Sequence, residues 1–502
     1  MPRMADPFYI TTAIHYPNGR PHIGHAYEMI AADAIARFQR QQGRDVFFQT
    51  GTDEHGLKMV KTARDRDMTA RELADEMSGY FSEMAEKLDI SCDRFIRTSE
   101  AEHYKASQAI WQAMADAGDL YLDRYEGWYS VRDEAFYEEK ELTEGEGDVK
   151  LSPQGTPVEW TAEETWFFKL SKYEKPLLDF YAANPDFIRP ESRRNEILRF
   201  VEGGLADLSV SRTSFDWGVP VPGSPGHVMY VWVDALTNYL TGAGYPDDQE
   251  RLAKYWPADI HLIGKDIVRF HAVYWPAFLM SANIALPKQV FGHGFLLNRG
   301  EKMSKSVGNV VDPMALADYY GVDALRYFLL RDVSFGNDGT FSDEAIVTRA
   351  NADLSNSFGN LAQRTLAFIA KNCEGHVETG RVEEADGVLI AEVENACGGF
   401  IRAFEDLALS QGVELWMAGV FACNAYIDAQ APWGLRKTDP ERMHAVLTTL
   451  LRAIRRLAVT IAPVVPSSAQ KLLTQLGPEG DADFRIAPPT PIFPRLELKE
   501  EA

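Results

Sequence analysis

Two short strings in the chain combine side chains that suit phosphate binding. The first is His22-Ile23-Gly24-His25, which follows a run of β-branched and aromatic residues and opens a stretch with apolar residues at helical spacing. A helix N-terminus offers unpaired backbone N–H groups and a positive dipole end. Gly24 has no Cβ, so another group can approach its backbone closely. We expect His22 and His25 to share one face and to donate hydrogen bonds to phosphate, although ordinary surface or core histidines remain an alternative.

The second string is Lys302-Met303-Ser304-Lys305-Ser306, which glycines flank on both sides. Two lysines three residues apart, together with two hydroxyls, describe a flexible cationic loop. Its natural partner is a polyphosphate, because clustered ammonium groups neutralise phosphate charge. An exposed basic loop without any ligand would show the same spacing, so the string alone leaves both readings open.

The hydrophobic pattern predicts the elements that must position these strings. Residues 8–12 read as a strand, 23–42 as a helix and 45–50 as a buried strand, which together form a βαβ unit. Such a unit implies a parallel sheet with its ligand at the carboxyl ends of the strands. The α/β pattern returns after Val228, with predicted helices and strands in the following ranges: helices 231–240 and 266–282, strands 259–263 and 289–291.

Between and after these segments the pattern changes. Residues 119–210 are rich in Tyr and Trp and predict short strands, with an acidic, Gly-rich tract at 138–150 that reads as a solvated loop. Beyond residue 343 the pattern is almost wholly helical and predicts a bundle, with segments near 343–372, 384–409, 411–429, 440–462 and 465–475. The Pro-rich tail at 487–494 cannot be a helix interior and is expected to pack back as an extended strap.

Composition excludes several classes of protein. The 502 residues suffice for roughly three domains at about 150 residues each, and 45% of them are hydrophobic, which excludes disorder. With 51 Lys and Arg against 74 Asp and Glu, the net charge is −23, so the chain is not a general polycation that coats nucleic acid. Any RNA must bind through a local basic strip.

Targeting and cysteine patterns point to a soluble, cytoplasmic protein. The N-terminus lacks a charged region followed by an apolar one, and no run of about 18 apolar residues occurs. The four cysteines, Cys92, Cys373, Cys397 and Cys423, form no CxxC pair, so we expect reduced, buried thiols.

Taken together, a βαβ start that carries HIGH and a later KMSKS loop resemble the class I aminoacyl-tRNA synthetases. In this chemistry an ionised carboxylate attacks the α-phosphate of ATP, so no general base is needed. Catalysis becomes positioning and charge neutralisation as pyrophosphate leaves. The catalytic residues implied are His22, His25, Lys302 and Lys305, with the larger transition-state role at Lys305. The ATP-binding residues implied are His22, Gly24, His25, Lys265, Asp266, Lys302, Ser304 and Lys305, with Mg²⁺ bound to the nucleotide.

The amino acid follows from what surrounds these motifs. Synthetases for leucine, isoleucine and valine carry a much larger editing domain than residues 119–210 could form, and a cysteine-specific enzyme would use thiolate zinc ligands. The strings AIHYPNG (13–19), YVWVDA (230–235) and GKDIVRFH (264–271) resemble the methionyl-tRNA synthetase family, over essentially the whole chain. The resemblance implies these methionine-binding residues: Ala13, Ile14, Tyr16, Trp232, Ala235, Tyr239, Ile267, His271 and Trp275 at the side chain, and Asp53 at the ammonium group.

The residue chemistry agrees with a thioether substrate. Sulfur is polarizable and favours contact with aromatic rings. Weak donors at Tyr16 and His271 could distinguish sulfur from a methylene, a difference worth about 1–3 kcal/mol. Without the resemblance, Trp232, Trp275 and His271 would read as ordinary core residues, and Asp53 and Asp266 as helix caps.

The resemblance implies an α/β protein with a Rossmann-like catalytic domain around a parallel sheet, an inserted connective lobe and a C-terminal all-α anticodon-binding helix bundle. We expect five parts: 1–118 and 211–290 as the two halves of the catalytic domain, 119–210 as the insertion, 291–345 as the KMSKS loop and stem-contact region, and 346–502 as the anticodon-binding domain with its strap. Methionine and ATP would form methionyl-adenylate, and the terminal adenosine of tRNA(Met), including the initiator species, would then displace AMP.

The insertion departs from the pattern of family members that carry a zinc knuckle. Ser130 and Asp133 stand where a CxxC pair would be, and no Cys or His follows before Trp160. Structural zinc needs four such ligands, usually rich in thiolates. We therefore predict no zinc, with packing of Trp128, Phe136, Tyr137 and Trp160 holding the lobe.

The helical part contains residues that match the family's anticodon-reading helices, namely Asn360, Arg364 and Trp433. Asn360 and Arg364 are four apart and share a helix face. Trp433 follows Pro432, so its ring could project and stack on a splayed base. Helix packing and surface polarity are the alternatives. Because the chain ends soon after the strap, without the further dimerising domain of some family members, we expect a monomer.

Three other functions fit parts of the pattern. A synthetase for another small apolar amino acid would share both strings, and a small nucleotidyltransferase would share HxGH alone. A non-catalytic tRNA-binding relative would be expected to lose His25 or Lys305, and both are present.

Overall fold

The computed structural model describes residues 5–133, 135–145, 147, 149–298, 300–303, 309–478 and 483–499, without the side chains of Tyr125, Ala135, Phe136, Glu163, Lys302 and Asp483. The chain forms two compact units. The first comprises residues 1–32, 42–86 and 90–293, and the second comprises 33–41, 87–89 and 294–502. Each unit has its own architecture.

A six-stranded parallel sheet organises the first unit. Its strand order is β3-β2-β1-β13-β14-β9, and every neighbouring pair is parallel. The strands are β1 (Pro7–Thr12), β2 (Asp45–Thr52), β3 (Arg94–Arg97), β9 (Ile188–Arg189), β13 (Ile260–Gly264) and β14 (Val290–His293). Strands β1 and β2 are buried over nearly their whole length, as expected for a sheet covered on both faces. The predicted βαβ unit and parallel sheet are confirmed.

Helices connect these strands. They are α1 (Ile23–Gln41), α2 (Leu57–Asp65), α3 (Ala70–Lys87), α4 (Ala101–Asp116), α7 (Val231–Gly242), α8 (Gln249–Tyr255) and α9 (Trp275–Ser281). The single helix predicted over 266–282 is instead a 3₁₀ turn at Lys265–Ile267, a π-helical segment at Phe270–Tyr274 and then α9. Pro276, the second residue of α9, lacks the N–H that a continuous α-helix would use.

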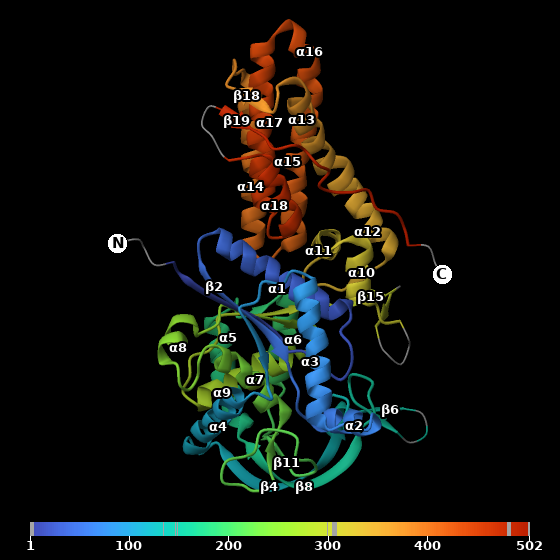
Figure 1. Ribbon diagram of the computed structural model, residues 1–502. Helices are drawn as coiled ribbons and strands as arrows, with labels where there is room; N and C mark the ends of the chain where they lie inside the picture. The colour runs from blue at the N-terminus through green and yellow to red at the C-terminus, as the bar shows by residue number, and fades with distance from the viewer. Residues whose placement is uncertain are drawn as a thin grey trace. The chain divides into compact units, whose positions relative to one another are not determined.

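Residues 119–210 build a lobe around two long paired strands rather than short ones. Strands β4 (Leu120–Ser130) and β8 (Glu159–Phe168) pair antiparallel along their length, as Figure 1 shows. The smaller strands of this range are β5 (Ala135–Tyr137), β6 (Thr143–Glu144), β7 (Lys150–Leu151) and β10 (Leu208–Ser209), and a separate pair, β11 (Ser211–Arg212) and β12 (Val228–Met229), follows it. Two helices, α5 (Glu174–Ala183) and α6 (Glu191–Glu202), were not predicted, and β9 from the same range extends the parallel sheet.

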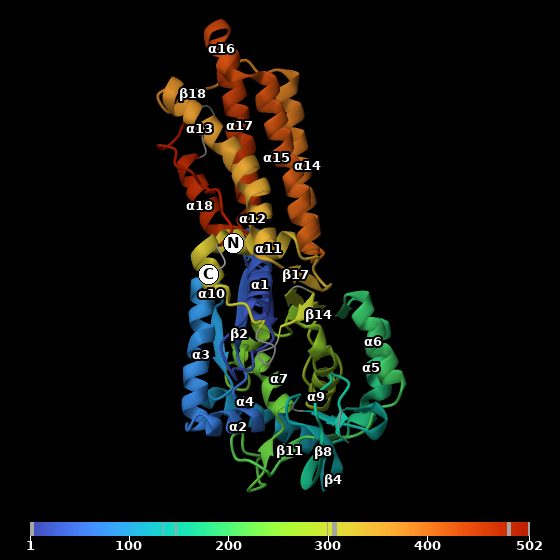
Figure 2. The same ribbon diagram turned by 90° about the vertical axis from the view of Figure 1, so that its right-hand side faces the viewer.

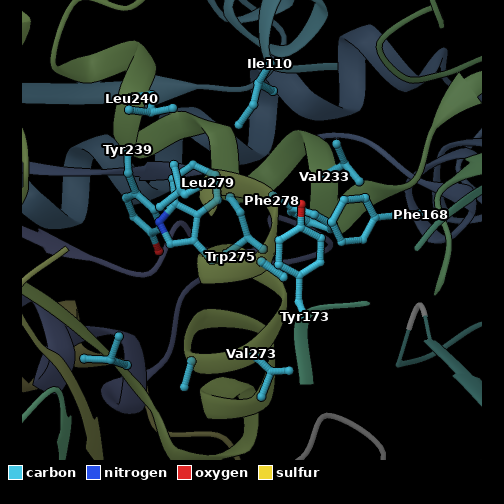
Figure 3. Packing of buried hydrophobic residues seen from close by; sticks show 14 of the residues in the cluster. Ile110, Phe168, Tyr173, Val233, Tyr239, Leu240, Val273, Trp275, Phe278 and Leu279 are labelled. Atoms are coloured by element: carbon cyan, nitrogen blue, oxygen red, sulfur yellow. The ribbon is translucent and has the colours of Figure 1, made fainter. Parts of the chain in front are cut away.

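Aromatic rings fill much of the core of the first unit. Phe168 stacks on Tyr173 with ring centroids 5.5 Å apart and meets Phe278 edge-on at 4.9 Å. Trp275 is fully buried and meets Tyr239 at 6.2 Å. Figure 3 shows these rings gathered around α9. This core fixes α7 and α9, which carry several predicted site residues.

The second unit is predominantly helical. A small sheet of β15 (Leu296–Asn298), β16 (Glu301–Lys302) and β17 (Gly339–Phe341) precedes most of its helices, and β18 (His376–Glu378) pairs with β19 (Asp483–Arg485). Its helices are α10 (Pro313–Tyr320), α11 (Val322–Arg331), α12 (Asp343–Arg349), α13 (Asn360–Asn372), α14 (Glu384–Glu405), α15 (Leu409–Gln430), α16 (Pro432–Thr438), α17 (Pro440–Ile461) and α18 (Pro466–Gln475), with a π-helical segment at Ala350–Gly359. Figures 1 and 2 show α14, α15 and α17 side by side, which confirms the predicted bundle.

The tail packs back on this unit as predicted. The Thr490 N–H donates to the Gln475 side chain at 2.9 Å, and the Asn351 amide exchanges two hydrogen bonds with the backbone of Leu496, at 2.8 and 2.9 Å. Residues 486–499 lie outside helices and strands, consistent with their prolines.

Two further sequence predictions can be compared with the structure. No cysteine forms a disulfide, but only Cys397 and Cys423 are buried, whereas Cys92 and Cys373 are half-buried. No helix within the described ranges is both long and apolar enough to cross a membrane.

Candidate active site

Strand β1 lies between β2 and β13, and from it the chain builds the sheet outward in both directions. Strands β2 and β3 lie on one side, and β13 and β14 lie on the other, so the strand order reverses at β1. In open parallel sheets such a reversal leaves a crevice at the carboxyl ends of the strands, where ligands bind. Three predicted segments follow these ends directly. They are residues 13–25 after β1, 53–56 after β2 and 265–267 after β13.

The HIGH string begins helix α1, as predicted. The imidazoles of His22 and His25 stack with centroids 3.8 Å apart, so both histidines lie on one face of the helix start. The Gly24 N–H donates to His22 Nδ1 at 3.1 Å, and a Cβ at Gly24 would come within 2.9 Å of the His22 ring. The glycine therefore makes room for the imidazole of His22. This arrangement places two ring donors beside a helix N-terminus, where an anion is favoured.

Asp53 lies in a segment that several bonds hold. Its N–H donates to the His15 carbonyl at 2.9 Å. The next residue, Glu54, is fully buried and accepts two hydrogen bonds from Arg97, at 2.6 and 3.1 Å. Trp217 Nε1 donates to the Glu54 carbonyl at 2.5 Å. The backbone that carries Asp53 is thus fixed on both sides.

An aromatic cluster joins α7 to the segment after β13. The Trp232 ring stacks on Phe270 at 3.7 Å, with an angle of 4° between the planes, and meets His271 edge-on at 6.1 Å. Tyr239 lies about two turns further along α7 than Trp232 and donates its hydroxyl hydrogen to His271 Nε2 at 2.7 Å. The Tyr239 ring also stacks on the His261 ring, with centroids 4.1 Å apart. Trp232, Tyr239 and His271 therefore form one wall of rings, which suits a thioether.

The protonation of His271 follows from its partners. Nδ1 lies 3.0 Å from the Ile267 carbonyl oxygen, which can only accept, so Nδ1 carries the proton and Nε2 accepts from Tyr239. Burial lowers the pKa of His271 to about 4, so the ring is neutral near pH 7. Neither nitrogen then has a proton to donate to sulfur. Ile267 and Tyr239 occupy both ring nitrogens, so this arrangement does not favour the donor role predicted for His271.

The remaining predicted methionine residues divide into two groups. Ala13, Ala235 and Trp275 are buried, whereas Ile14, Tyr16 and Ile267 are partly exposed. The Tyr16 hydroxyl accepts from the Met59 N–H at 3.2 Å. Trp275 is fully buried, and its Nε1 has no hydrogen-bond partner among the described residues. Trp275 contacts Tyr239 and so extends the aromatic wall, while Ala13, Ile14 and Tyr16 follow β1.

The residues predicted to bind the nucleotide are only partly described. Lys265 and Asp266 begin the 3₁₀ turn after β13, where Asp266 is exposed, and a Cβ at Gly264 would meet the Asp266 carboxylate at 2.8 Å. Of the second string, the side chain of Lys302 and all of Ser304 and Lys305 lie outside the described residues. Their predicted roles rest on the sequence.

A hydrogen-bonded polar cluster stands where a zinc knuckle would be. Asp133 Oδ2 accepts from Ser152 Oγ at 2.7 Å, from Tyr137 OH at 3.1 Å and from the Thr156 hydroxyl. Ser130 Oγ accepts from the Asp133 N–H at 3.1 Å and lies 2.7 Å from Thr156 Oγ1. Across the described residues no group of His, Cys, Asp or Glu is arranged to hold a metal ion.

The aromatic packing predicted for this lobe is present in part. Trp128 and Trp160 meet edge-on at 5.3 Å, but Trp160 is 57% exposed. Tyr137 is buried and packs with Val158, whereas the Phe136 side chain lies outside the described residues. Rings and hydroxyls together hold the lobe, and the sequence prediction named only the rings.

The three predicted anticodon residues lie on the helical unit. Asn360 begins α13 and is exposed, and Arg364 follows one turn later on that helix. The Arg364 guanidinium lies 5.4 Å from the centre of the Trp433 ring and donates to Asp428 at 2.7 Å. Ala431 adopts a left-handed conformation with φ 43°, Pro432 opens α16, and Trp433 is 48% exposed. Arg364 and Trp433 thus form a partly exposed pair that could hold a base.

Sequence reasoning missed a buried polar network around Asp234. His55, His103 and Asp234 come from three segments far apart in the chain, and all are at most 1% exposed. A signal was present, because Asp234 interrupts the otherwise apolar start of the helix at 231–242. A carboxylate in such a run must find partners when it is buried.

Two family models match the chain. The first, "tRNA synthetases class I (M)", covers residues 8–366, and the second, "Anticodon binding domain of methionyl tRNA ligase", covers residues 377–487. The first match spans more than half of the 502 residues. The chain belongs to the class I tRNA synthetases, in their methionyl family.

Individual relatives agree over nearly the whole length. A methionine–tRNA ligase of Brucella suis biovar 1 (strain 1330) is 57% identical over 508 residues, which cover 98% of this chain and 99% of the relative. The Mycobacterium tuberculosis methionyl-tRNA synthetase in complex with methionyl-adenylate has a TM-score of 0.95 at 54% identity, covering 98% of this chain and all of the other. The free-state structure of the M. tuberculosis enzyme has a TM-score of 0.89 at 50% identity, with 99% of this chain covered.

Proposed function

We propose that the chain is a methionine–tRNA ligase. It activates methionine with ATP to methionyl-adenylate and transfers the methionyl group to the terminal adenosine of tRNA(Met), releasing AMP and pyrophosphate. The observation that carries this function is the pairing of β1 with β13, the strands that precede the histidine-bearing start of α1 and the turn leading to His271. A site for phosphate and a site for an apolar side chain therefore belong to the same end of one sheet.

The nucleotide is held by charged side chains and by the dipole of helix α1, and the reaction needs no general base. His22 and His25 donate to phosphate oxygens at the start of α1, where Gly24 leaves room for the His22 imidazole, and Lys265 and Asp266 serve the nucleoside end. Lys302, Ser304 and Lys305 neutralise the triphosphate as pyrophosphate leaves. Mg²⁺ accompanies ATP, because hard cations prefer phosphate oxygens. No structural zinc is required, because the polar cluster around Asp133 ties the lobe together.

Methionine is recognised at both of its ends. Asp53 accepts the ammonium group, and the rings of Trp232, Tyr239 and Trp275 surround the thioether together with Ala13, Ile14, Ala235 and Ile267. Tyr16 is the remaining candidate donor to sulfur, while His271 holds the Tyr239 hydroxyl in place. The substrate carboxylate is then free to attack the α-phosphate.

The RNA is read by the helical part. Asn360, Arg364 and Trp433 take up unstacked anticodon bases by hydrogen bonding and stacking. Both elongator and initiator tRNA(Met) are substrates, and the enzyme acts as a cytoplasmic monomer. The five-part division at 1–118, 119–210, 211–290, 291–345 and 346–502 describes how these tasks are distributed.

The proposal is tested by amino-acid-dependent exchange of pyrophosphate into ATP. We expect exchange with methionine and none above background with leucine, isoleucine or valine. Preference for one of those three would assign the chain to another synthetase specificity. Exchange without any amino acid would assign it to the nucleotidyltransferases, and no exchange with any of them would indicate a non-catalytic tRNA-binding protein.

A further inference from the structure

The Asp234 carboxylate is a buried charge outside the groups assigned to substrate. It lies on α7 and is inaccessible to solvent. His55 Nδ1 lies 2.5 Å from Oδ2, and His103 Nε2 lies 2.6 Å from Oδ1, so each carboxylate oxygen has its own imidazole partner. Burial pushes the pKa of Asp234 upward, but the two histidines outweigh it and lower the pKa to about 2. The group is therefore a carboxylate near neutral pH.

The histidines are themselves anchored. His55 Nε2 lies 3.0 Å from the Tyr104 hydroxyl, and the His55 ring meets Trp217 edge-on at 5.3 Å. His103 Nδ1 lies 3.0 Å from Thr241 Oγ1, about two helical turns beyond Asp234 on α7. Each imidazole thus has a partner on both of its nitrogens. The geometry leaves little freedom to the segments that carry them.

These segments bear the two ends of the methionine site. His55 follows Asp53 by two residues, and Asp234 lies between Trp232 and Ala235. His103 comes from α4, which packs along α7. The bonds of Asp234 therefore join the backbone proposed to hold the ammonium group to the helix proposed to hold the side chain.

We propose that Asp234, with His55 and His103, is a positioning network that sets the separation between the ammonium-binding and thioether-binding parts of the methionine site. It touches neither methionine nor ATP. This inference rests on the proposed function, because it presupposes that Asp53 and the aromatic wall bind the two ends of one amino acid. A buried carboxylate with two imidazole bonds resists displacement, since any shift leaves a charge unpaired.

The test compares variants by KM in pyrophosphate exchange, with methionine binding measured by calorimetry in the absence of ATP. Asp234→Asn keeps the shape but removes the charge. It should raise the KM for methionine at least tenfold and leave the KM for ATP within twofold. Asp119→Asn is the matched control, because Asp119 is equally buried but bonds to Lys172, Tyr173 and Ser281 rather than to His55, His103 or Asp234. It should leave both constants within twofold.

Conservative replacements add a second readout. His55→Asn presents an amide N–H where Nδ1 stood, and His103→Gln presents one where Nε2 stood. Each should recover most of the methionine affinity that the corresponding alanine variant loses. If Asp234→Asn does not fold, the inference is tested by comparing the methionine affinity of His55→Ala with that of His55→Asn.

Two results would overturn the inference. One is that either Asp234→Asn or His55→Ala has a KM for methionine within twofold of the wild-type value. The other is an equal rise in both KM values, which would indicate a general loss of structure. Wild-type protein that shows no methionine-dependent exchange would instead refute the proposed function, so the two failures are distinguishable.

Discussion

At the scale of the residue, partners decide what a side chain can do. His271 looks like a sulfur donor in the sequence, but Ile267 and Tyr239 occupy its nitrogens. His22 and His25 were predictable because their relation is local, three positions along one helix. The bonds from Asp234 to His55 and His103 were not predictable, because these partners lie 179 and 131 positions away in the sequence and no local pattern encodes them.

The pKa of His271 predicts a pH dependence of stability. The pKa is about 4 in the fold against 6.5 for the free side chain, so the unfolded chain takes up the proton first as pH falls. The neutral His271 ring therefore contributes to the free energy of unfolding in full above pH 6.5. This contribution is lost as pH falls to about 4, at about 1.4 kcal/mol per pH unit and about 3 kcal/mol in all. His271→Asn should remove this part of the slope in denaturant unfolding between pH 7 and 4. An unchanged slope would contradict the assignment.

Lys305 carries a prediction about chemistry. Lys305→Ala should slow adenylate formation by roughly 10²-fold or more, because a charge that stabilises the leaving pyrophosphate is lost. Methionine affinity should stay within about twofold of wild type, since Lys305 has no assigned contact with the amino acid. Rapid-quench measurement of adenylate, with calorimetry of methionine, checks both. A rate close to wild type would remove Lys305 from the mechanism.

At the scale of the element, periodicity predicted the sheet and the bundle but not their irregularities. The strands at 8–12 and 45–50 were clear as short runs rich in β-branched and aromatic residues, and the helices after 384 were clear because their apolar residues recur at helical spacing. The π segments at Phe270–Tyr274 and Ala350–Gly359 keep an almost helical pattern, so periodicity cannot distinguish them. Strand β9 is two residues long and offers no period at all.

The insertion lobe carries a prediction about metal and stability. A chelator should leave its thermal unfolding unchanged, because oxygen and hydroxyl groups around Asp133 replace metal ligands. Asp133→Ala should cost roughly 1–3 kcal/mol, because buried hydroxyls lose their acceptor. Amide hydrogen exchange of β4 and β8 should rise in this variant and not in the control Asp123→Ala, whose side chain is exposed. Stoichiometric zinc in purified protein, or melting on chelation, would refute this account of the lobe.

At the scale of the whole molecule, a net charge of −23 means that RNA can bind only at a restricted part of the surface. The general surface repels a polyanion, so affinity must come from specific contacts. The sequence offers no sign of the contact between the Arg364 guanidinium and the Trp433 ring, because the two residues lie on different helices. It did identify each residue separately through the family's motifs.

This arrangement predicts that tRNA recognition and activation can be separated. Trp433→Ala should lower kcat/KM for tRNA(Met) by about tenfold or more, as expected for one lost stacking contact of about 1–3 kcal/mol. Methionine-dependent pyrophosphate exchange should not change. Phe421→Ala serves as the control, because Phe421 is 56% exposed on the same unit and has no assigned role. Equal effects of the two variants would argue against base stacking on Trp433.

The most direct measurement is a crystal structure of the chain with methionyl-adenylate bound. We predict the ammonium group on Asp53, the thioether against Trp232 and Tyr239, and the phosphate at the start of α1 beside His22 and His25. An adenylate bound away from the carboxyl ends of β1 and β13, or a methionine side chain outside the aromatic wall, would contradict the site described here.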